Sequence, residues 1–248
     1  MSSLVTAFII LACTLSGMLI GLCLRGVLPD HHTRDDSKDI LKTGTGVMAT
    51  LVALIIGLLV SSAKSSYDTV NASITQGGAK IITLNYFLSC YGPEAKEVQE
   101  LLRVTVAAGI KRIWNNAVLT ELERATGMND VFDKIRDLSP QNDSHHYLKS
   151  QALQLSADLM QARWLVIEQS QNKLPATFLI VLTFWLIVLF GNLSLLAPRN
   201  LTAVVSLFIC AISMAGAIFI ILELNQPLEG TIKVSSAPLV KALSIIAH

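Results

Sequence analysis

The chain has 248 residues, of which 52% are hydrophobic and 15% are charged, a composition too apolar for an ordinary soluble domain and typical of an integral membrane protein. Its 19 basic and 18 acidic residues give a formal net charge of +1, so no overall field favours nucleic acid or an acidic substrate as a partner. Four scattered cysteines without a C-x-x-C spacing indicate neither a zinc site nor a redox pair.

The first apolar run, Leu4 to Leu24, contains no charged residue. It could be a signal peptide, but it lacks a basic n-region and is longer than a usual h-region. We therefore predict a retained transmembrane helix. Gly17 and Gly21 give this helix a small-x-x-x-small face, which allows close approach of a neighbouring helix.

A short loop, residues 25–42, joins this run to the next and carries four basic and four acidic residues together with a histidine pair. Because short loops rich in Lys and Arg stay in the cytoplasm, the positive-inside rule predicts that this loop is cytoplasmic and that residues 64–175 are periplasmic. His31, His32, Asp35 and Asp36 could ligate a divalent metal ion. Adjacent residues rarely aim at one ion, however, so the simpler interpretation is an interfacial loop in which Asp35 or Asp36 caps the following helix.

The uncharged run Thr43 to Ala63 is long enough to cross roughly 30 Å of hydrocarbon as a helix. One face of this helix carries small residues spaced three and four apart, namely Gly46, Thr50, Ala53, Gly57 and Ser61. Two interpretations fit that face. It serves ordinary close helix packing, or copies from several subunits surround an ion path, because small and hydroxylated residues leave room for water.

From Lys64 to Pro175 the chain becomes polar, and its apolar residues show helical spacing. Two series seven apart, Tyr67, Ile74, Ile81, Leu88 and Val70, Gly77, Leu84, Tyr91, predict that the second membrane helix continues beyond the bilayer to about Cys90. Gly92-Pro93 should end it, and Gly77-Gly78 is a weak point within it.

Three further helical segments are predicted in the same region. One runs from Pro93 to about Leu122 with Ile113 on its inner face, one covers Val131 to Leu138, and one begins near Ser144. Together with the extension of the second membrane helix, they predict an antiparallel helical bundle outside the bilayer.

Two more membrane helices are predicted, at Ala176–Leu196 and Leu201–Leu222, joined by a hairpin turn. Asn192, a single amide in hydrocarbon, should hydrogen-bond a neighbouring helix or face a pore. Glu223 follows at the membrane boundary, where it could form a cation-attracting ring in a symmetric assembly or simply reach water. In the tail, Leu239 to Ala247 should form a short apolar helix on the bundle or on the membrane surface.

These elements predict an all-α integral membrane protein with four transmembrane helices and an extramembrane helical bundle. Four segments follow: residues 1–63 with the first two membrane helices, 64–175 with the bundle, 176–222 with the last two membrane helices, and the tail 223–248. The sequence contains no P-loop, no G-x-S-x-G and no H-E-x-x-H, so we expect neither catalysis nor a bound cofactor.

Four stretches of the sequence resemble one family. They are L-P-D-H-H-T-R-D-D-S-K-D, the following T-G-T-G-V-M-A-T-L-V-A-L-I-I-G-L-L-V-S-S-A-K-S-S-Y-D, then Y-G-P-E-A-K-E, and N-Q-P-L-E-G-T-I-K-V-S-S-A-P-L in the tail. Together they are similar to the bacterial bestrophin-like membrane proteins over nearly the whole chain. The resemblance implies a four-helix, multi-pass protein of the bacterial inner membrane. The family name implies kinship with bestrophins, which are pentameric anion channels, so membrane lipid, inorganic ions and four further copies of the chain are the expected partners.

Two functions are open at this point. The first is an oligomeric ion channel or channel-like pore whose second membrane helix lines the path, with the small-residue positions 46, 50, 53, 57 and 61, Asn192 and Glu223 as candidate pore-lining residues. The second is a non-conducting membrane scaffold whose helical bundle binds a partner.

Overall fold

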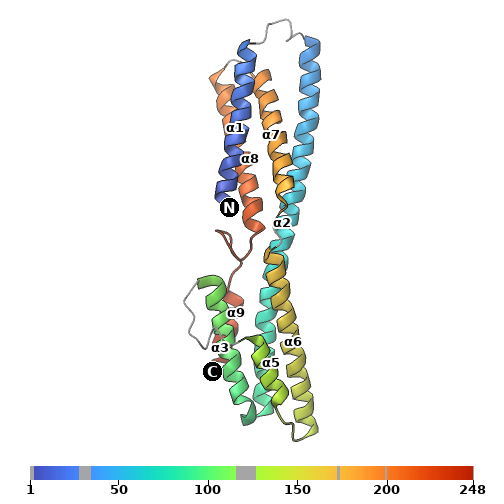
Figure 1. Cartoon of the computed structure of the whole chain (residues 1–248), viewed down its shortest axis with the longest axis vertical. Helices are drawn as coiled ribbons and strands as arrows, with labels where there is room; N and C mark the ends of the chain where they lie inside the picture. The colour runs from blue at the N-terminus through green and yellow to red at the C-terminus, as the bar shows by residue number, and fades with distance from the viewer. Residues whose placement is uncertain (1–2, 28–34, 116–126, 172–173, 199, 248) are drawn as a thin grey trace. The chain divides into compact units, whose positions relative to one another are not determined.

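The computed structural model describes residues 3–27, 35–115, 127–171, 174–198 and 200–247, and within these ranges every regular element is a helix (Figure 1). The chain divides into two compact units. The first, Met1–Ser66 with Lys173–Ile232, is called the membrane unit below. The second, Tyr67–Asn172 with Lys233–His248, is called the helical unit.

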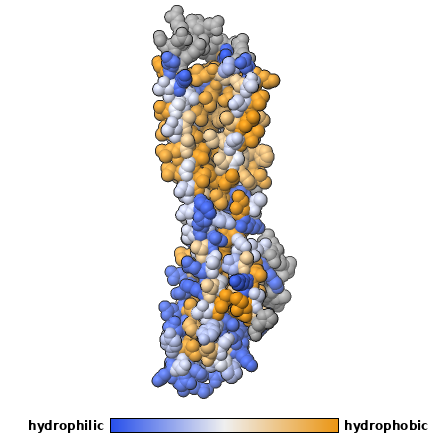
Figure 2. Space-filling view, turned by 180° about the vertical axis from the view of Figure 1, so that it is seen from behind, coloured by the Kyte–Doolittle hydropathy of each residue, from blue (hydrophilic) through white to orange (hydrophobic). Residues whose placement is uncertain are grey.

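Four helices supply the membrane unit, namely α1 (Ser3–Val27), the first part of α2 (Asp35–Tyr91), α7 (Ala176–Leu196) and α8 (Leu201–Leu224). All four are long and apolar enough to cross a membrane, which confirms the predicted fold class. The surface of this unit is largely hydrophobic (Figure 2). The helix α7 has the predicted bounds, and the other helices extend a few residues or more beyond theirs.

The helices α1 and α7 lie closely side by side because two glycines remove side chains from their contact. A Cβ atom on Gly17 would lie 2.6 Å from the carbonyl oxygen of Ile187, and one on Gly21 would lie 2.2 Å from the carbonyl oxygen of Gly191. The Oγ of Ser194 would be 2.0 Å from that second Cβ. The small-x-x-x-small face predicted for the first helix is therefore a helix-packing face within one chain.

The core of the membrane unit combines side chains from all four helices. Its fully or nearly buried members are Ile10, Met18, Val52, Leu182, Leu186, Leu189, Phe190, Ala211, Ile218 and Leu222. Since lipid is as apolar as these side chains, close packing rather than hydrophobic burial must hold the helices together.

The helix α2 is uninterrupted over 57 residues, as the heptad spacing predicted. Tyr67 is half-buried, and the other large side chains of the two series seven apart are buried: Val70, Ile74, Ile81, Leu84, Leu88 and Tyr91 are each at most 6% exposed. The helix ends at Gly92, whose φ of +112° lies in the region that favours glycine, and Pro93 follows.

The remainder of the helical unit departs from the prediction at one helix. A 3₁₀ turn (Pro93–Ala95) leads into α3 (Lys96–Ile110), and a π-helical segment (Lys111–Asn115) follows, whereas residues 116–122 of the predicted helix lie outside the described residues. The prediction that Ile113 faces inward is wrong, because it is 36% exposed. A π turn adds a residue per turn and so rotates the positions after Ile110 away from the α-helical register.

Two predicted helices of the helical unit are present with slightly different bounds. They are α5 (Met128–Asp137) and α6 (Asp143–Gln171). Val131 and Ile135 of α5 are fully buried in the same core as Leu84, Leu88 and Leu102.

The tail helix α9 (Ala237–Ile246) packs on the helical unit, so of the two predicted locations the bundle is the one observed. Its Ala242 is 0% exposed. The residues before it are held by two hydrogen bonds: the Trp114 Nε1–H donates to the carbonyl oxygen of Val234 at 2.7 Å, and the Tyr67 hydroxyl donates to that of Lys233 at 3.5 Å.

The Gly77-Gly78 pair does not break α2. One of the two glycines, Gly78, packs against the tail. A Cβ on Gly78 would lie 2.9 Å from the carbonyl oxygen of Pro238, whereas one on Gly77 would meet nothing within 4 Å.

Alanine substitutions at these two neighbouring positions are expected to have opposite effects. Gly77→Ala should stabilise the protein by about 0.5–1 kcal/mol, since alanine costs less than glycine inside a helix. Gly78→Ala should lose that gain and destabilise by about 1–2 kcal/mol, because the new methyl group pushes α9 away. Thermal unfolding of the two purified variants measures both effects, and equal shifts would show that α9 is not seated on Gly78.

Candidate functional site

The small-residue face of α2, defined as Gly46, Thr50, Ala53, Gly57 and Ser61, is exposed along its whole length. A Cβ on Gly46 or Gly57 would meet nothing within 4 Å. The Thr50 hydroxyl donates to the carbonyl oxygen of Gly46 at 3.0 Å, so its proton is used inside the helix while its oxygen stays on the surface. The face is therefore uncharged, weakly polar and uncovered by the other described residues of its own chain.

Two other faces divide the remaining surface of α2. An inward face contains Thr45, Val52 and Ala63, which are 5%, 0% and 1% exposed, and it adds Met48, Ile55, Ile56 and Leu59 to the core of the membrane unit. A leucine-rich face, Val47, Leu51, Leu54 and Leu58, is 44–62% exposed.

The angles between these faces follow from helix geometry. At about 100° per residue, the small-residue and leucine-rich faces are centred roughly 90° apart, and the inward face lies roughly 130–140° from each of them.

Asn192 and Glu223, the other predicted pore-lining residues, lie on different helices from this face. Asn192 is half-buried on α7, next to Gly191 at the contact with α1. Glu223 is near the end of α8 and is only 3% exposed. The alternative that Glu223 is an interfacial charge that simply reaches water is therefore wrong.

The Glu223 carboxylate accepts hydrogen bonds from two parts of the membrane unit, the loop after α8 and the start of α1. The backbone N–H groups of Thr231 and Ile232 donate to its Oε2, the second at 3.2 Å, and the Ser3 side chain at the start of α1 is a further partner. Gly230, with φ of +83°, lets the loop pass so closely that a Cβ there would lie 2.7 Å from Oε2. Such donors offset the cost of burying a carboxylate, and they fix the loop after α8 to the start of α1.

The side chains of the four predicted metal candidates lie outside what the structure describes. His31 and His32 lie outside the described residues, and Asp35 and Asp36 begin α2, so the predicted loop 25–42 is helical from Asp35 onward. Among the residues that the structure describes, no three His, Cys, Asp or Glu side chains are placed to share a metal ion.

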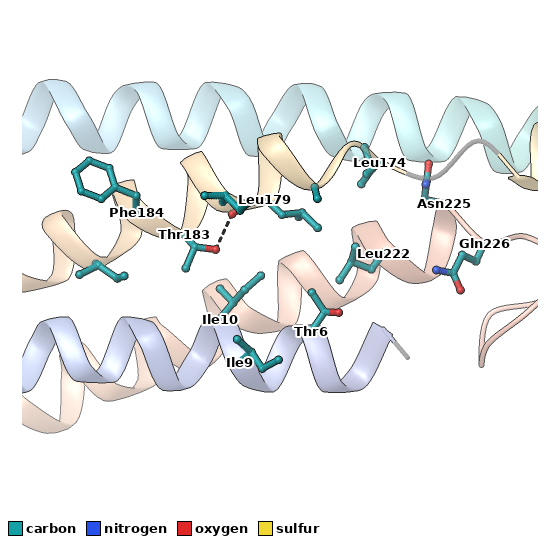
Figure 3. Close-up of a pocket in the computed structure, with 13 residues that line it drawn as sticks. Thr6, Ile9, Ile10, Leu174, Leu179, Thr183, Phe184, Leu222, Asn225 and Gln226 are labelled. Carbon is teal, nitrogen blue, oxygen red and sulfur yellow. Dashed lines mark hydrogen bonds between the residues drawn. The ribbon is translucent and has the colours of Figure 1, made fainter. Parts of the chain in front are cut away.

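A groove of about 640 Å³ opens in the membrane unit between the start of α1, the start of α7 and the end of α8 (Figure 3). Its buried floor includes Ile10 and Leu222, which are 3% and 8% exposed, whereas Ile9, Ile180 and Phe184 stand at its rim with 46–67% exposure. The other lining residues are Thr6, Leu174, Ala176, Leu179, Thr183, Ile187, Asn225 and Gln226.

Sequence reasoning missed both this groove and the partners of Glu223. Each brings the start of α1 together with segments more than 150 residues later in the chain, and the start of α1 on its own has the composition of any membrane helix end. The one local signal was Gly230, whose place in a polar stretch after Glu223 is compatible with a tight loop.

The comparisons with known proteins give one match. The model of a family described as the Bestrophin-like domain matches residues 9–239, which is nearly the whole chain. Comparison with curated proteins and with solved structures gave no match.

Proposed function

This chain belongs to the bestrophin-like domain family, and from that premise we propose that several copies of it assemble into an ion channel or channel-like pore lined by α2. The family suggests a channel-like membrane protein rather than an enzyme. Four helices with the length and apolarity of membrane spans agree with that class.

One observation carries the choice of α2 as the lining helix. Its small-residue face is exposed at all five positions, although α2 buries another face in its own core. A helix surface that faces lipid does not need a long row of small and hydroxylated side chains, because leucine is better suited to contact with lipid. It suits either close contact with another copy or a path that water can enter.

The assembly follows from the three faces of α2. In a ring, the inward face stays with its own subunit, the small-residue face borders the axis, and the leucine-rich face meets the neighbouring copy or lipid. Five copies is the number that kinship with bestrophins suggests, and inorganic ions are the permeant species. Asn192 remains a candidate pore-lining residue. The buried Glu223 carboxylate instead accepts hydrogen bonds within its own subunit.

The membrane and orientation are part of the same proposal. We place the protein in the bacterial inner membrane, with the connection between α1 and α2 in the cytoplasm and the helical unit in the periplasm. This orientation follows from the short connection with its Arg and Lys residues.

Planar-bilayer recording of the purified full-length protein, in salts that vary the cation and the anion separately, tests the function. Gly57→Leu should reduce the conductance by about tenfold or more, since a leucine in each copy narrows and dries the path. Gly216→Leu is the matched control, because Gly216 is an exposed glycine of α8 with nothing within 4 Å of its Cβ. Absence of current from the unmodified protein, or equal losses in both variants, would contradict the proposal.

The non-conducting scaffold remains the second candidate, and one observation favours it. Trp164 and Leu165 of α6 are 68% and 48% exposed in the helical unit, which is more apolar surface than a solvated helix needs. Crosslinking in native membranes distinguishes the two functions. One dominant foreign partner at Trp164 together with a silent bilayer would support the scaffold.

A further inference from the structure

We propose that the groove between α1, α7 and the end of α8 binds one bilayer phospholipid, with an acyl chain along its floor and the polar part at Asn225 and Gln226. Neither the family assignment nor the proposed path through α2 requires such a site. Three features of the groove favour a lipid: its length, the position of its polar groups, and the contact at which it ends.

The length of the groove matches one leaflet. Its α7 wall runs from Ala176 to Ile187, which is about 16 Å at 1.5 Å per residue, or roughly half of the 30 Å hydrocarbon core of a bilayer. The wall begins at the first residue of α7, so the groove extends from the membrane boundary to about the middle of the bilayer.

Polar groups are confined to the boundary end. Asn225 and Gln226 come directly after α8, and Thr6 is near the start of α1, so all three lie at the same end of the groove (Figure 3). At the inner end the Thr183 hydroxyl donates to the carbonyl oxygen of Leu179 at 2.6 Å, which leaves the lining there apolar. An amphiphile with its polar part at the boundary complements this distribution.

The contact between α1 and α7 closes the inner end. Ile187 lines the groove and also meets Gly17, where the two backbones approach too closely for a side chain. Toward the boundary the facing residues are larger, including Ile9, Ile10 and Leu179, and all three line the groove. The groove therefore has a buried floor and ends at the contact between α1 and α7, unlike the convex surface that annular lipid covers.

A lipid explains the rim better than a second copy of the chain does. Ile9, Ile180 and Phe184 are apolar and about half or more exposed, and they project from membrane-spanning helices into the bilayer. The two faces assigned above to the assembly, the small-residue face and the leucine-rich face, belong to α2, and neither lines the groove.

A tryptophan reporter tests the proposal in the full-length protein. Ile180→Trp places the reporter at the rim, and Ile209→Trp is the matched control, since both isoleucines are exposed on membrane helices, at 67% and 57%, and only Ile180 lines the groove. A phosphatidylcholine with brominated acyl chains is added to delipidated protein in detergent. The signal is the quenching beyond that of the unmodified protein, which contains Trp114, Trp164 and Trp185.

We expect half-maximal quenching of Ile180→Trp near one lipid per chain, and of Ile209→Trp only at about tenfold more lipid. Native mass spectrometry should find one retained phospholipid per chain, and Thr183→Trp, which fills the groove from its wall, should reduce that occupancy by about tenfold. The unfolding midpoint of each variant shows whether its fold is kept.

Three results would overturn the proposal. The first is parallel quenching of the two reporters as bulk lipid rises. The second is unchanged lipid retention in a folded Thr183→Trp variant. The third is efficient Ile180→Cys disulfide dimers without retained lipid, which would assign the groove to a second copy.

Discussion

Replacing Gly21 with leucine is expected to separate α1 from α7 and to destabilise the membrane unit by about 3 kcal/mol, the upper part of the range for overpacking a tight contact. A Cβ at this position already falls 2.0–2.2 Å from atoms of Ser194 and Gly191. One of those atoms is a backbone carbonyl oxygen, so no rotamer change relieves the overlap and α7 must move.

The measurement is the unfolding of detergent-solubilised protein followed by circular dichroism. Gly216→Leu adds the same side chain to another membrane helix where nothing lies within 4 Å, and it should unfold within about 0.5 kcal/mol of the unmodified protein. If Gly21→Leu behaved like this control, α1 would not pack on α7 through its glycines.

Removing the Glu223 carboxylate should destabilise the protein at least as much as Gly21→Leu does. Glu223→Leu leaves the N–H groups of Thr231 and Ile232 without their acceptor. Hydrogen bonds to a charged group contribute about 1.5–3 kcal/mol each. Because the bonds share one acceptor and are not additive, the expected total loss is about 3–5 kcal/mol. Glu223→Gln keeps one acceptor oxygen and should lose about half as much.

Thermal unfolding together with limited proteolysis measures this effect, since the released segment after α8 should become a cleavage site. Glu229→Gln is the control, because Glu229 is an exposed carboxylate of the same segment. A Glu223→Leu protein that unfolds and resists protease like this control would show that the carboxylate does not hold the segment in place.

The helices were predictable because their signals are local. The uncharged run from Ala176 to Leu196 fixes both ends of α7, and the spacing of Val70, Ile74, Ile81 and Leu88 specifies the continuation of α2 beyond the membrane. The charge at Glu223 marks a membrane boundary for the same reason, since charged residues avoid hydrocarbon.

Other features were not predictable because they depend on contacts with distant segments or on a local departure from α-helical geometry. Nothing near Glu223 indicates that Ser3 is close to it, and nothing near Ile113 indicates that a π turn rotates it outward. The exposure of the α2 face is also a property of the fold. Gly46 and Gly57 each have a small residue four positions later, as Gly17 does, yet Gly17 and Gly21 are covered and the two glycines of α2 are not.

The partners of Glu223 have a consequence for biosynthesis. The carboxylate belongs to residue 223, while its donors are residues 3, 231 and 232. Residues 223–232 must therefore be synthesised before this charge finds all of its donors, and until then α8 carries an uncompensated anion at one end. The helix α1 is made long before α8 and the segment after it, so the Ser3 contact with Glu223 can form only late in the assembly of the membrane unit.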